Sequence, residues 1–302
     1  MKSVVLKVFS VVGVAVLIAG CGTDSKPTPS SEAAAPTPAP AVTPVLATVV
    51  APPVPVPATD GKVHLAYELQ VTNAMGSDVT LASLEVKAGD RTLLTLARDK
   101  LAYWTRALGA GTKPTTTLGP GQAGVVWLDV VVDNGTPAPT ELSHTIVVNV
   151  AKPMPPLIPA TVSENVAPVT VSTHKPAVIS PPLSGPNWLD GNSCCDMTAH
   201  RMAMNPLDGG LWGAERFAID YLQLSPDGTV FKGPKDKTES YPYFGADIHA
   251  VADGPVVGVV DGLPEQVAGK SPTGLPLDQY GGNHVVQDIS GGGTERRYAF
   301  YA

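Results

Sequence analysis

Side chains that can do chemistry gather in the last third of the chain. From Asn187 onward, aromatic, histidine and cysteine residues become frequent, beginning with the adjacent Cys194 and Cys195 and then His200. In an oxidising compartment, adjacent cysteines form a strained bridge with each other, or each pairs with another cysteine. Zinc binding and a reactive redox pair are the weaker alternatives. These two residues are therefore candidates for disulfide bonding.

The alternation of apolar residues around Asp220 predicts the strand that holds it. On a strand, Phe217, Ile219 and Tyr221 point one way, which leaves Ala218 and Asp220 on the opposite face. Further short strands are expected at 248–251, 256–260, 283–289 and 297–301. Separated by tight glycine turns, these strands predict a compact antiparallel sheet.

Four motifs follow one another in this region. A strand ending in Asp220 is followed by Gly-x-x-Ile-x-Ala-x-x-Asp-Gly-x-Val at 245–256, Gly-Asn-x-Val-Val at 282–286 and Tyr-Ala-x-Tyr at 298–301. In this order they resemble the lysostaphin-type zinc endopeptidases, which cleave bacterial cell-wall peptides, and the resemblance covers residues 187–302. It implies a β-sheet groove with one Zn²⁺ held between a His-x-x-x-Asp pair and the second histidine of a later His-x-His. Three protein ligands leave a position for a water whose pKa falls to about 7, so the implied reaction is hydrolysis of peptidoglycan peptide cross-links.

The first part of that zinc site is only partly present. Asp220 matches the aspartate of His-x-x-x-Asp, but Arg216 stands where the histidine should be, and a guanidinium cannot ligate zinc. His200 is the nearest substitute ligand if the intervening loop folds back; otherwise it is a structural loop histidine. Arg216 is expected to bind a substrate carboxylate or to pair with Asp220, and in the second case the site would be a non-catalytic relic.

The remaining histidines of this region are not expected to bind metal. His249 occupies a variable, solvent-facing position, and His284 is expected at the surface or lining the groove. Family members continue after Tyr-Ala-x-Tyr with a histidine and the His-x-His segment, whereas this sequence stops at Ala302. We therefore expect a fragment of a longer protein, with the catalytic residues beyond residue 302. The alternative is a degenerate, metal-free member that binds cell wall or regulates another hydrolase.

Residues 59–152 predict an immunoglobulin-like β-sandwich. From Lys62 to Thr72, apolar residues alternate with polar ones such as His64 and Glu68, which predicts a half-buried strand. Further strands are expected at 79–86, 92–96, 125–132 and 145–150, with glycine and asparagine turns between them. His64 and His144 are isolated and expected to be solvated, so this domain is expected to be a spacer or a binding module. Residues 153–186 are expected to be a Pro-rich linker, or an extended edge packed on the next domain.

The N-terminus predicts a lipoprotein. Residues 1–20 combine Lys2 and Lys7 with a short apolar run, which suits a signal peptide better than a membrane-spanning helix. The segment ends in Ile-Ala-Gly followed by Cys21, which resembles a bacterial lipobox with Cys21 as the lipidated residue. Residues 21–58 are rich in proline and alanine and predict an extended tether. The protein is therefore expected in the bacterial cell envelope, facing away from the cytoplasm, and on the outer membrane if the host has one.

Composition agrees with a mainly β protein and excludes some classes. The 302 residues include 31 prolines and 30 glycines, which rules out a helical bundle or coiled coil. The net charge is −7 and no block of lysine or arginine occurs, so binding to nucleic acid through phosphate neutralisation is not expected. The expected partners are peptidoglycan peptides and, through the lipid anchor, the membrane.

Overall fold

The computed structural model describes residues 41–109, 111 and 113–302. The expected signal peptide, the lipidated Cys21 and the tether up to residue 40 lie outside the described residues. Within the described part, no helix is long and apolar enough to cross a membrane. Strands dominate, which confirms the expected mainly β fold.

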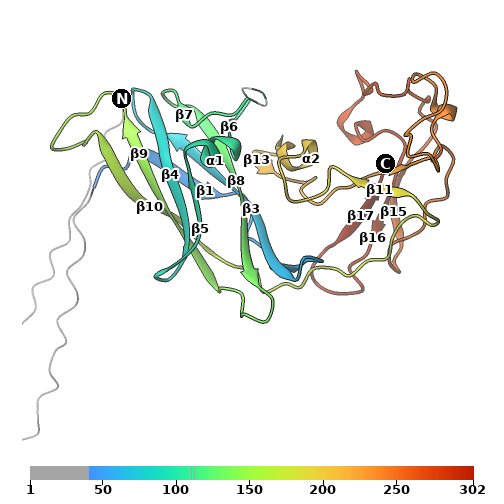
Figure 1. Cartoon of the computed structure of the whole chain (residues 1–302), viewed down its shortest axis with the longest axis horizontal. Coiled ribbons are helices and arrows are strands. Elements are labelled where there is room, and N and C mark those ends of the chain that lie inside the picture. The colour runs from blue at the N-terminus through green and yellow to red at the C-terminus, as the bar shows by residue number, and fades with distance from the viewer. Residues whose placement is uncertain (1–40, 110, 112) are drawn as a thin grey trace, which may run out of the picture. The chain divides into compact units, whose positions relative to one another are not determined.

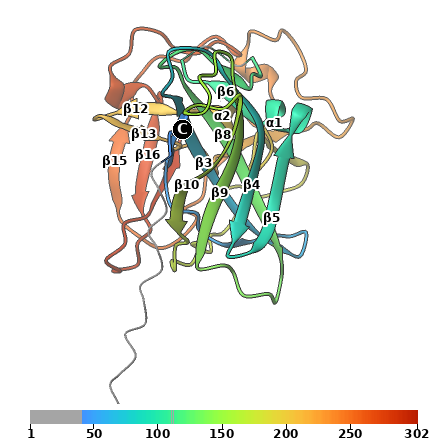
Figure 2. The ribbon, with the colours of Figure 1, turned by 90° about the vertical axis from the view of Figure 1, so that its left-hand side faces the viewer.

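Residues 45–170 form two antiparallel sheets (Figure 1). In the first sheet the order is β1-β3-β8-β6, with β2 paired to β3; its strands are β1 (Val45–Val49), β2 (Val56–Pro57), β3 (Lys62–Asn73), β6 (Thr105–Ala107) and β8 (Ala123–Asp133). In the second the order is β10-β9-β4-β5, with β7 paired to β4; its strands are β4 (Val79–Ala88), β5 (Arg91–Ala97), β7 (Thr117–Leu118), β9 (Glu141–Val150) and β10 (Thr161–Thr170). Figure 2 shows β10, β9, β4 and β5 side by side. The one helix of this part, α1 (Arg98–Tyr103), follows β5.

This strand order is that of an immunoglobulin-like sandwich. When β2 and β7 are set aside, the first sheet has the order A-B-E-D and the second the order G-F-C, with β5 added as C′. The inward faces of both sheets share one apolar core, which includes Leu65, Leu69, Leu84, Leu128 and Ile146. Alternation along β3, β4, β8 and β9 places these residues inward because successive side chains of a strand point to opposite faces.

Two expected boundaries of the sandwich were wrong. β1 and β2 lie in the segment expected to be tether, and all five residues of β1 pair with β3. β10 lies in the segment expected to be linker and pairs with β9 along its length, with a bulge between Val166 and Val169. Pro168 lies inside that bulge, where a residue without a backbone N–H is tolerated. A proline-rich composition therefore hid strands at the edges of both sheets.

The sequence also misplaced His144. It is fully buried, and its Nε2 lies 2.8 Å from the hydroxyl of Tyr67 while its Nδ1 lies 2.9 Å from the carbonyl oxygen of Ala167. Burial lowers the pKa of His144, since a charged imidazolium is poorly solvated inside the core. His144 shares the inward face of β9 with Leu142, Ile146 and Val148, which is why it is buried.

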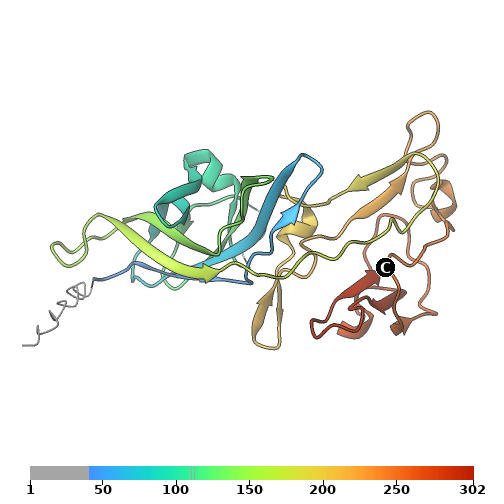
Figure 3. The same cartoon turned by 90° about the horizontal axis from the view of Figure 1, so that it is seen from below.

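The region after residue 187 consists of small separate sheets. β11 (Trp188–Gly191) pairs with β14 (Asp220–Gln223), as Figure 3 shows, and β12 (Asn205–Leu207) pairs with β13 (Gly210–Trp212). A third sheet has the order β15-β16-β17, formed by β15 (Val256–Val260), β16 (His284–Asp288) and β17 (Tyr298–Tyr301). Three short helices lie in this region: α2 (Ala199–Met202), η1 (Thr238–Ser240) and η2 (Leu277–Gln279).

The expected single sheet is therefore wrong for residues 187–302. The strand expected around Asp220 begins only at Asp220 and pairs with β11, outside the β15-β16-β17 sheet. Residues 248–251 are not a strand, because their backbone bonds go to the proline-rich segment before the region: His249 donates to the carbonyl of Pro182, and Val251 accepts from Ser180. Pro181 and Pro182 have no N–H to extend such a ladder. The end of the expected linker thus packs as an extended edge on this region.

Candidate functional site

His200 and Asp220 lie next to each other, twenty positions apart in the sequence. The Nε2 atom of His200 is 3.3 Å from Oδ1 of Asp220. The imidazole is largely buried, with 18% of the side chain exposed, whereas the carboxyl group is about half exposed at 49%. The loop between them folds back, which was the condition for His200 to act together with Asp220.

Short secondary structure elements hold each member of the pair. His200 lies in α2, whose N-cap Thr198 accepts a hydrogen bond from the backbone N–H of Arg201 through its side chain. Asp220 is the first residue of β14 and pairs with Gly191 at the end of β11. A Cβ atom on Gly191 would come within 3.0 Å of the carbonyl oxygen of Asp220, so only glycine fits this approach without a shift of the backbone.

Further hydrogen bonds fix the orientation of both side chains. The Nδ1 atom of His200 lies 3.2 Å from the carbonyl oxygen of Ala218, which favours a proton on Nδ1 and leaves Nε2 as a lone-pair donor. The second carboxylate oxygen of Asp220 accepts a 2.6 Å hydrogen bond from Nδ2 of Asn192. One imidazole nitrogen and one carboxylate oxygen therefore point at each other, with the opposite atom of each group already bonded.

This arrangement fits two ligands of a zinc ion. Two atoms bound at about 2.0 Å to a tetrahedral metal lie about 3.3 Å from each other. Metal-bound histidines usually donate their other N–H to a carbonyl or carboxylate, and metal-bound carboxylates are themselves hydrogen-bonded, as His200 and Asp220 are. In the described part of the chain, no group of three or more His, Cys, Asp or Glu side chains could hold a metal. The pair is thus part of a possible site, and a third ligand is not among the described residues.

The side chain of Arg216 does not bind Asp220 and does not line an open pocket. Its guanidinium pairs with Glu68 of β3, with Nε at 2.9 Å from Oε1 and Nη2 in contact with Oε2. The expected pairing with Asp220 is therefore wrong, and the arginine serves a contact between the C-terminal region and the sandwich. A two-pronged guanidinium bond to a carboxylate is among the stronger ion pairs in proteins.

Arg201 binds the same carboxylate from another direction. Its Nη1 lies 3.0 Å from Oε1 of Glu68, and its Nη2 donates to the carbonyls of Leu128 at 2.8 Å and Tyr67 at 3.3 Å. Arg201 is 1% exposed and Glu68 is fully buried. Burial lowers the pKa of Arg201, and the charge of Glu68 opposes that shift. We call Glu68, Arg201 and Arg216 the Glu68 cluster.

The other candidate residues lie apart from the pair. His249 is exposed and donates its backbone N–H to Pro182. His284 is half-buried, with its Nδ1 2.8 Å from the carbonyl oxygen of Gly282 and its ring 4.7 Å from that of Phe300. Cys194 and Cys195 are bonded to each other as a vicinal disulfide, one of the two expected outcomes. The next residue, Asp196, accepts a 2.6 Å hydrogen bond from the hydroxyl of Tyr103 in α1.

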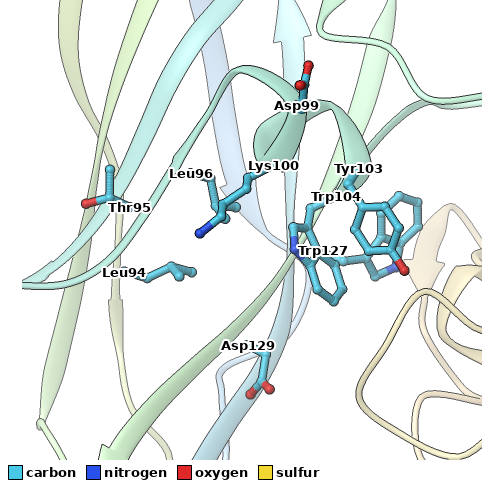
Figure 4. Close-up of a pocket in the computed structure, with 9 residues that line it drawn as sticks. All are labelled: Leu94, Thr95, Leu96, Asp99, Lys100, Tyr103, Trp104, Trp127 and Asp129. Atoms are coloured by element: carbon cyan, nitrogen blue, oxygen red, sulfur yellow. The ribbon is translucent and has the colours of Figure 1, made fainter.

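A second feature is a depression on the sandwich between β5, α1 and β8. Its volume is about 510 Å³, within the range of small-ligand sites. Figure 4 shows Asp99 at the top, Lys100 to the left of the rings of Trp104 and Trp127, and Asp129 below. The remaining lining residues are Leu94, Thr95, Leu96 and Tyr103. Trp127 is 3% exposed, so Tyr103 and Trp104 supply the accessible aromatic surface. Aromatic surface beside charged groups of both signs suits an uncharged ligand that carries hydroxyl groups, such as a sugar.

Three important residues were missed in the sequence. Asn192 and Arg201 are neighbours of candidate residues, and nothing in their spacing marks them as contacts. Glu68 was assigned to the solvent side of its strand by alternation, and it does point away from the sandwich core. Its complete burial comes from a segment more than a hundred residues later in the chain. The burial of Glu68 and its contacts with the arginines are therefore apparent only in the folded structure.

Comparison with known proteins adds little. No family model matches the chain, and no curated protein matches it. The X-ray structure of Northeast Structural Genomics Consortium target SoR45 is similar to part of it, with a TM-score of 0.25 and 13% sequence identity. The match covers 43% of this chain and 83% of that one. A likeness at this score says nothing about function.

Proposed function

We propose that this protein is a cell-envelope lipoprotein, anchored through Cys21, whose C-terminal region belongs to a zinc metalloendopeptidase that hydrolyses peptide cross-links of peptidoglycan. The observation that supports this best is the 3.3 Å approach of His200 Nε2 to Asp220 Oδ1. In that contact His200 takes the place of the histidine ligand that the family has at the position of Arg216. The motif order around it supports the choice of enzyme class.

In this proposal His200 and Asp220 hold the metal, and Ala218 and Asn192 hold those two ligands. By the family resemblance, the third ligand is the second histidine of a His-x-His segment. A zinc ion bound there would act as a Lewis acid and lower the pKa of its water to about 7. The carbonyl of Ala218 keeps the proton of His200 on Nδ1, and the amide of Asn192 restrains the Asp220 carboxylate, so both ligands are oriented in advance.

Metal analysis of the full-length gene product tests the proposal. We expect about one zinc per chain after mild dialysis, and its loss in Asp220→Ala and in His200→Ala. The matched controls are Asp247→Ala and His249→Ala, which change exposed residues of the same types in the same region. Release of soluble peptides from purified peptidoglycan should follow the zinc content. A folded protein without zinc would contradict the enzyme.

The second candidate function is a metal-free module that binds cell wall. The Glu68 cluster favours it, because Arg216 is engaged in a structural contact in place of a ligand, and so does the aromatic depression on the sandwich. Co-sedimentation with purified peptidoglycan tests this function. We expect Trp104→Ala to lose binding and Trp212→Ala, an exposed tryptophan outside the depression, to retain it. Equal binding of both variants would exclude the depression as the binding site.

A further inference from the structure

The Glu68 cluster joins the sandwich to both segments that carry the candidate ligands. Arg201 directly follows His200 in α2, and Arg216 precedes Asp220 by four residues. Both guanidinium groups bind the same carboxylate. A single sandwich residue thus lies at the point where the two ligand segments meet.

We propose that Glu68 is a positioning residue for the His200–Asp220 pair. The inference rests on the proposed zinc site and deepens it: the sandwich acts as part of the site's support in addition to any role as a spacer. Glu68 does not touch the pair itself. It acts through Arg201 and Arg216.

Burial makes this contact specific. Glu68 and Arg201 are almost completely excluded from water, so neither charge has solvent to replace a lost partner. Removal of one member of a buried ion pair leaves an uncompensated charge and is strongly destabilising locally. Arg201 is further held by two backbone carbonyls, one from β3 and one from β8. These contacts therefore hold α2 at one position on the outer face of the first sheet.

The two arginines are close to the candidate ligands along the chain, so fixing the arginines also fixes the ligands. The Cα atoms of the consecutive residues His200 and Arg201 lie about 3.8 Å apart, and the four residues from Arg216 to Asp220 span at most about 14 Å. Hydrogen bonds from Arg216 N to Gly213 and from Ala218 N to Glu215 tighten the second segment into turns. A shift of either arginine would therefore move a ligand, and a shift of about 1 Å is enough to weaken a metal site.

The test compares Glu68→Gln with Leu84→Ala in the full-length gene product. Leu84 lies on β4 in the second sheet, so Leu84→Ala destabilises the sandwich core without changing a residue that contacts the cluster, and it separates positioning from general loss of stability. The readouts are zinc affinity by competition with a chromophoric chelator, the visible absorption of the Co²⁺-substituted protein, and amide hydrogen exchange of residues 199–203 and 216–223 without metal. We expect Glu68→Gln to weaken zinc binding at least tenfold, to alter the Co²⁺ spectrum and to speed exchange in both segments. Leu84→Ala should leave the Co²⁺ spectrum unchanged.

A second pair of variants covers the case in which Glu68→Gln does not fold. Arg216 is the more exposed arginine of the cluster, with 15% of its side chain accessible. Arg216→Met should weaken zinc binding, and Arg216→Lys should restore part of it because lysine keeps the charge but loses the two-pronged bond. Equal zinc affinity in the wild type, Arg216→Met and Arg216→Lys would overturn the inference.

The outcomes separate this inference from the proposed function. If Asp220→Ala loses zinc and Glu68→Gln binds it as the wild type does, the enzyme stands and the positioning role falls. If Asp220→Ala keeps its zinc, the proposed site is wrong. Exchange in the metal-free protein then decides whether Glu68 fixes the two segments: unchanged rates in Glu68→Gln would overturn that role too.

Discussion

The sandwich and the region after residue 187 bury different kinds of side chain. The sandwich encloses a continuous apolar core that spans both sheets. Among the described residues 187–302, Val251 is the one buried apolar residue, while Arg201, Ser225, Ser240 and Gln287 are the buried polar ones. Gln287 donates to the carbonyls of Ala252 and Gly254 and so fixes a loop in place of filling a core.

This difference assigns different sources of stability to the two regions. Apolar burial is proportional to area and does not depend on direction, so the sandwich can be stable whatever its loops contain. Hydrogen bonds and ion pairs depend on geometry, and each buried polar group is costly when its partner is lost. The positions of His200 and Asp220 therefore depend on a few specific contacts, several of which the sandwich provides.

The largest expected effect is in the sandwich core. Leu128→Ala removes a fully buried side chain, which should lower the free energy of unfolding by about 2–5 kcal/mol. The control, Val259→Ala, changes a side chain of β15 that is 60% exposed and should stay within about 0.5 kcal/mol of the wild type. Urea unfolding followed by circular dichroism measures both. Equal losses would mean that β15 is covered in solution.

The second effect is a pH dependence that originates at Glu164 of β10. Burial raises the pKa of Glu164 to about 7, although the backbone N–H of Val45 opposes the shift. Between its ordinary pKa of 4.5 and 7, the folded protein holds a proton that the unfolded chain has lost, so stability falls as the pH rises through this window. The whole change is about 3 kcal/mol.

Glu164→Gln removes this pH dependence. The variant should lose the fall in stability that Glu164 causes between pH 4.5 and 7, whereas Glu141→Gln, an exposed glutamate on the neighbouring β9, should retain the slope of the wild type. Thermal unfolding at several pH values is sufficient. A slope that survives in Glu164→Gln would place its origin at another group.

Gly254 tests how strongly the C-terminal region depends on backbone geometry. A Cβ atom there would overlap the carbonyl oxygen of Asp288, and the φ angle of 154° is unfavourable for other residues. Gly254→Ala should cost about 2 kcal/mol locally. In limited proteolysis we expect faster cleavage after residue 187 and an intact sandwich.

Gly262 provides the matched control for that substitution. It also has a positive φ angle, 85°, but no atom lies within 4 Å of a Cβ placed there. Gly262→Ala should therefore change the cleavage rate less than Gly254→Ala. Loss of the sandwich in Gly254→Ala would show that the two regions unfold together.

The sequence predicted the parts of the fold that follow alternation. The strand at 62–72 was expected almost as found, because apolar residues at every second position mark a half-buried strand, and the strand at 125–132 was expected from its run of apolar residues. β1 contains no proline and was missed because the proline-rich composition of residues 21–58 led the whole segment to be assigned as a tether. β10 contains Pro168, which lowers strand propensity but is tolerated in an edge strand. The alternation of Leu142, Ile146 and Val148 would also have placed His144 in the core.

The candidate site was predictable only in part. Asp220 came from a motif, and His200 from the need for a ligand to replace Arg216. The partner of Arg216 could not be derived, because alternation assigns Glu68 to an outward face and cannot say what covers that face. Contacts between residues more than a hundred positions apart need the tertiary structure.

The smallest expected effect concerns His64 on the outward face of β3. Burial alone would lower the pKa of His64, but its hydrogen bonds with Asp129 and Asp60 raise it overall. The Nδ1 atom lies 2.9 Å from Asp129 and Nε2 lies 3.1 Å from Asp60, so the imidazolium has a carboxylate on each side. Its contribution is fully present below pH 6.5 and is lost as the pH rises through the raised pKa.

His64→Gln should therefore cost about 1 kcal/mol at pH 5.5 and almost nothing at pH 9. The window of His64 begins at pH 6.5 and overlaps the upper end of that of Glu164, so measurement in the Glu164→Gln background is needed to separate the two groups. His174→Gln is the control, because His174 pairs with Glu295 at an exposed position outside the sandwich core. If His64→Gln were equally costly at both pH values, the loss would come from packing. In that case His64 would stabilise the outward face of β3 through packing, as the apolar residues do in the core. Stabilisation by polar contacts on that face would then start at Glu68 and would not extend to the edge of the sheet.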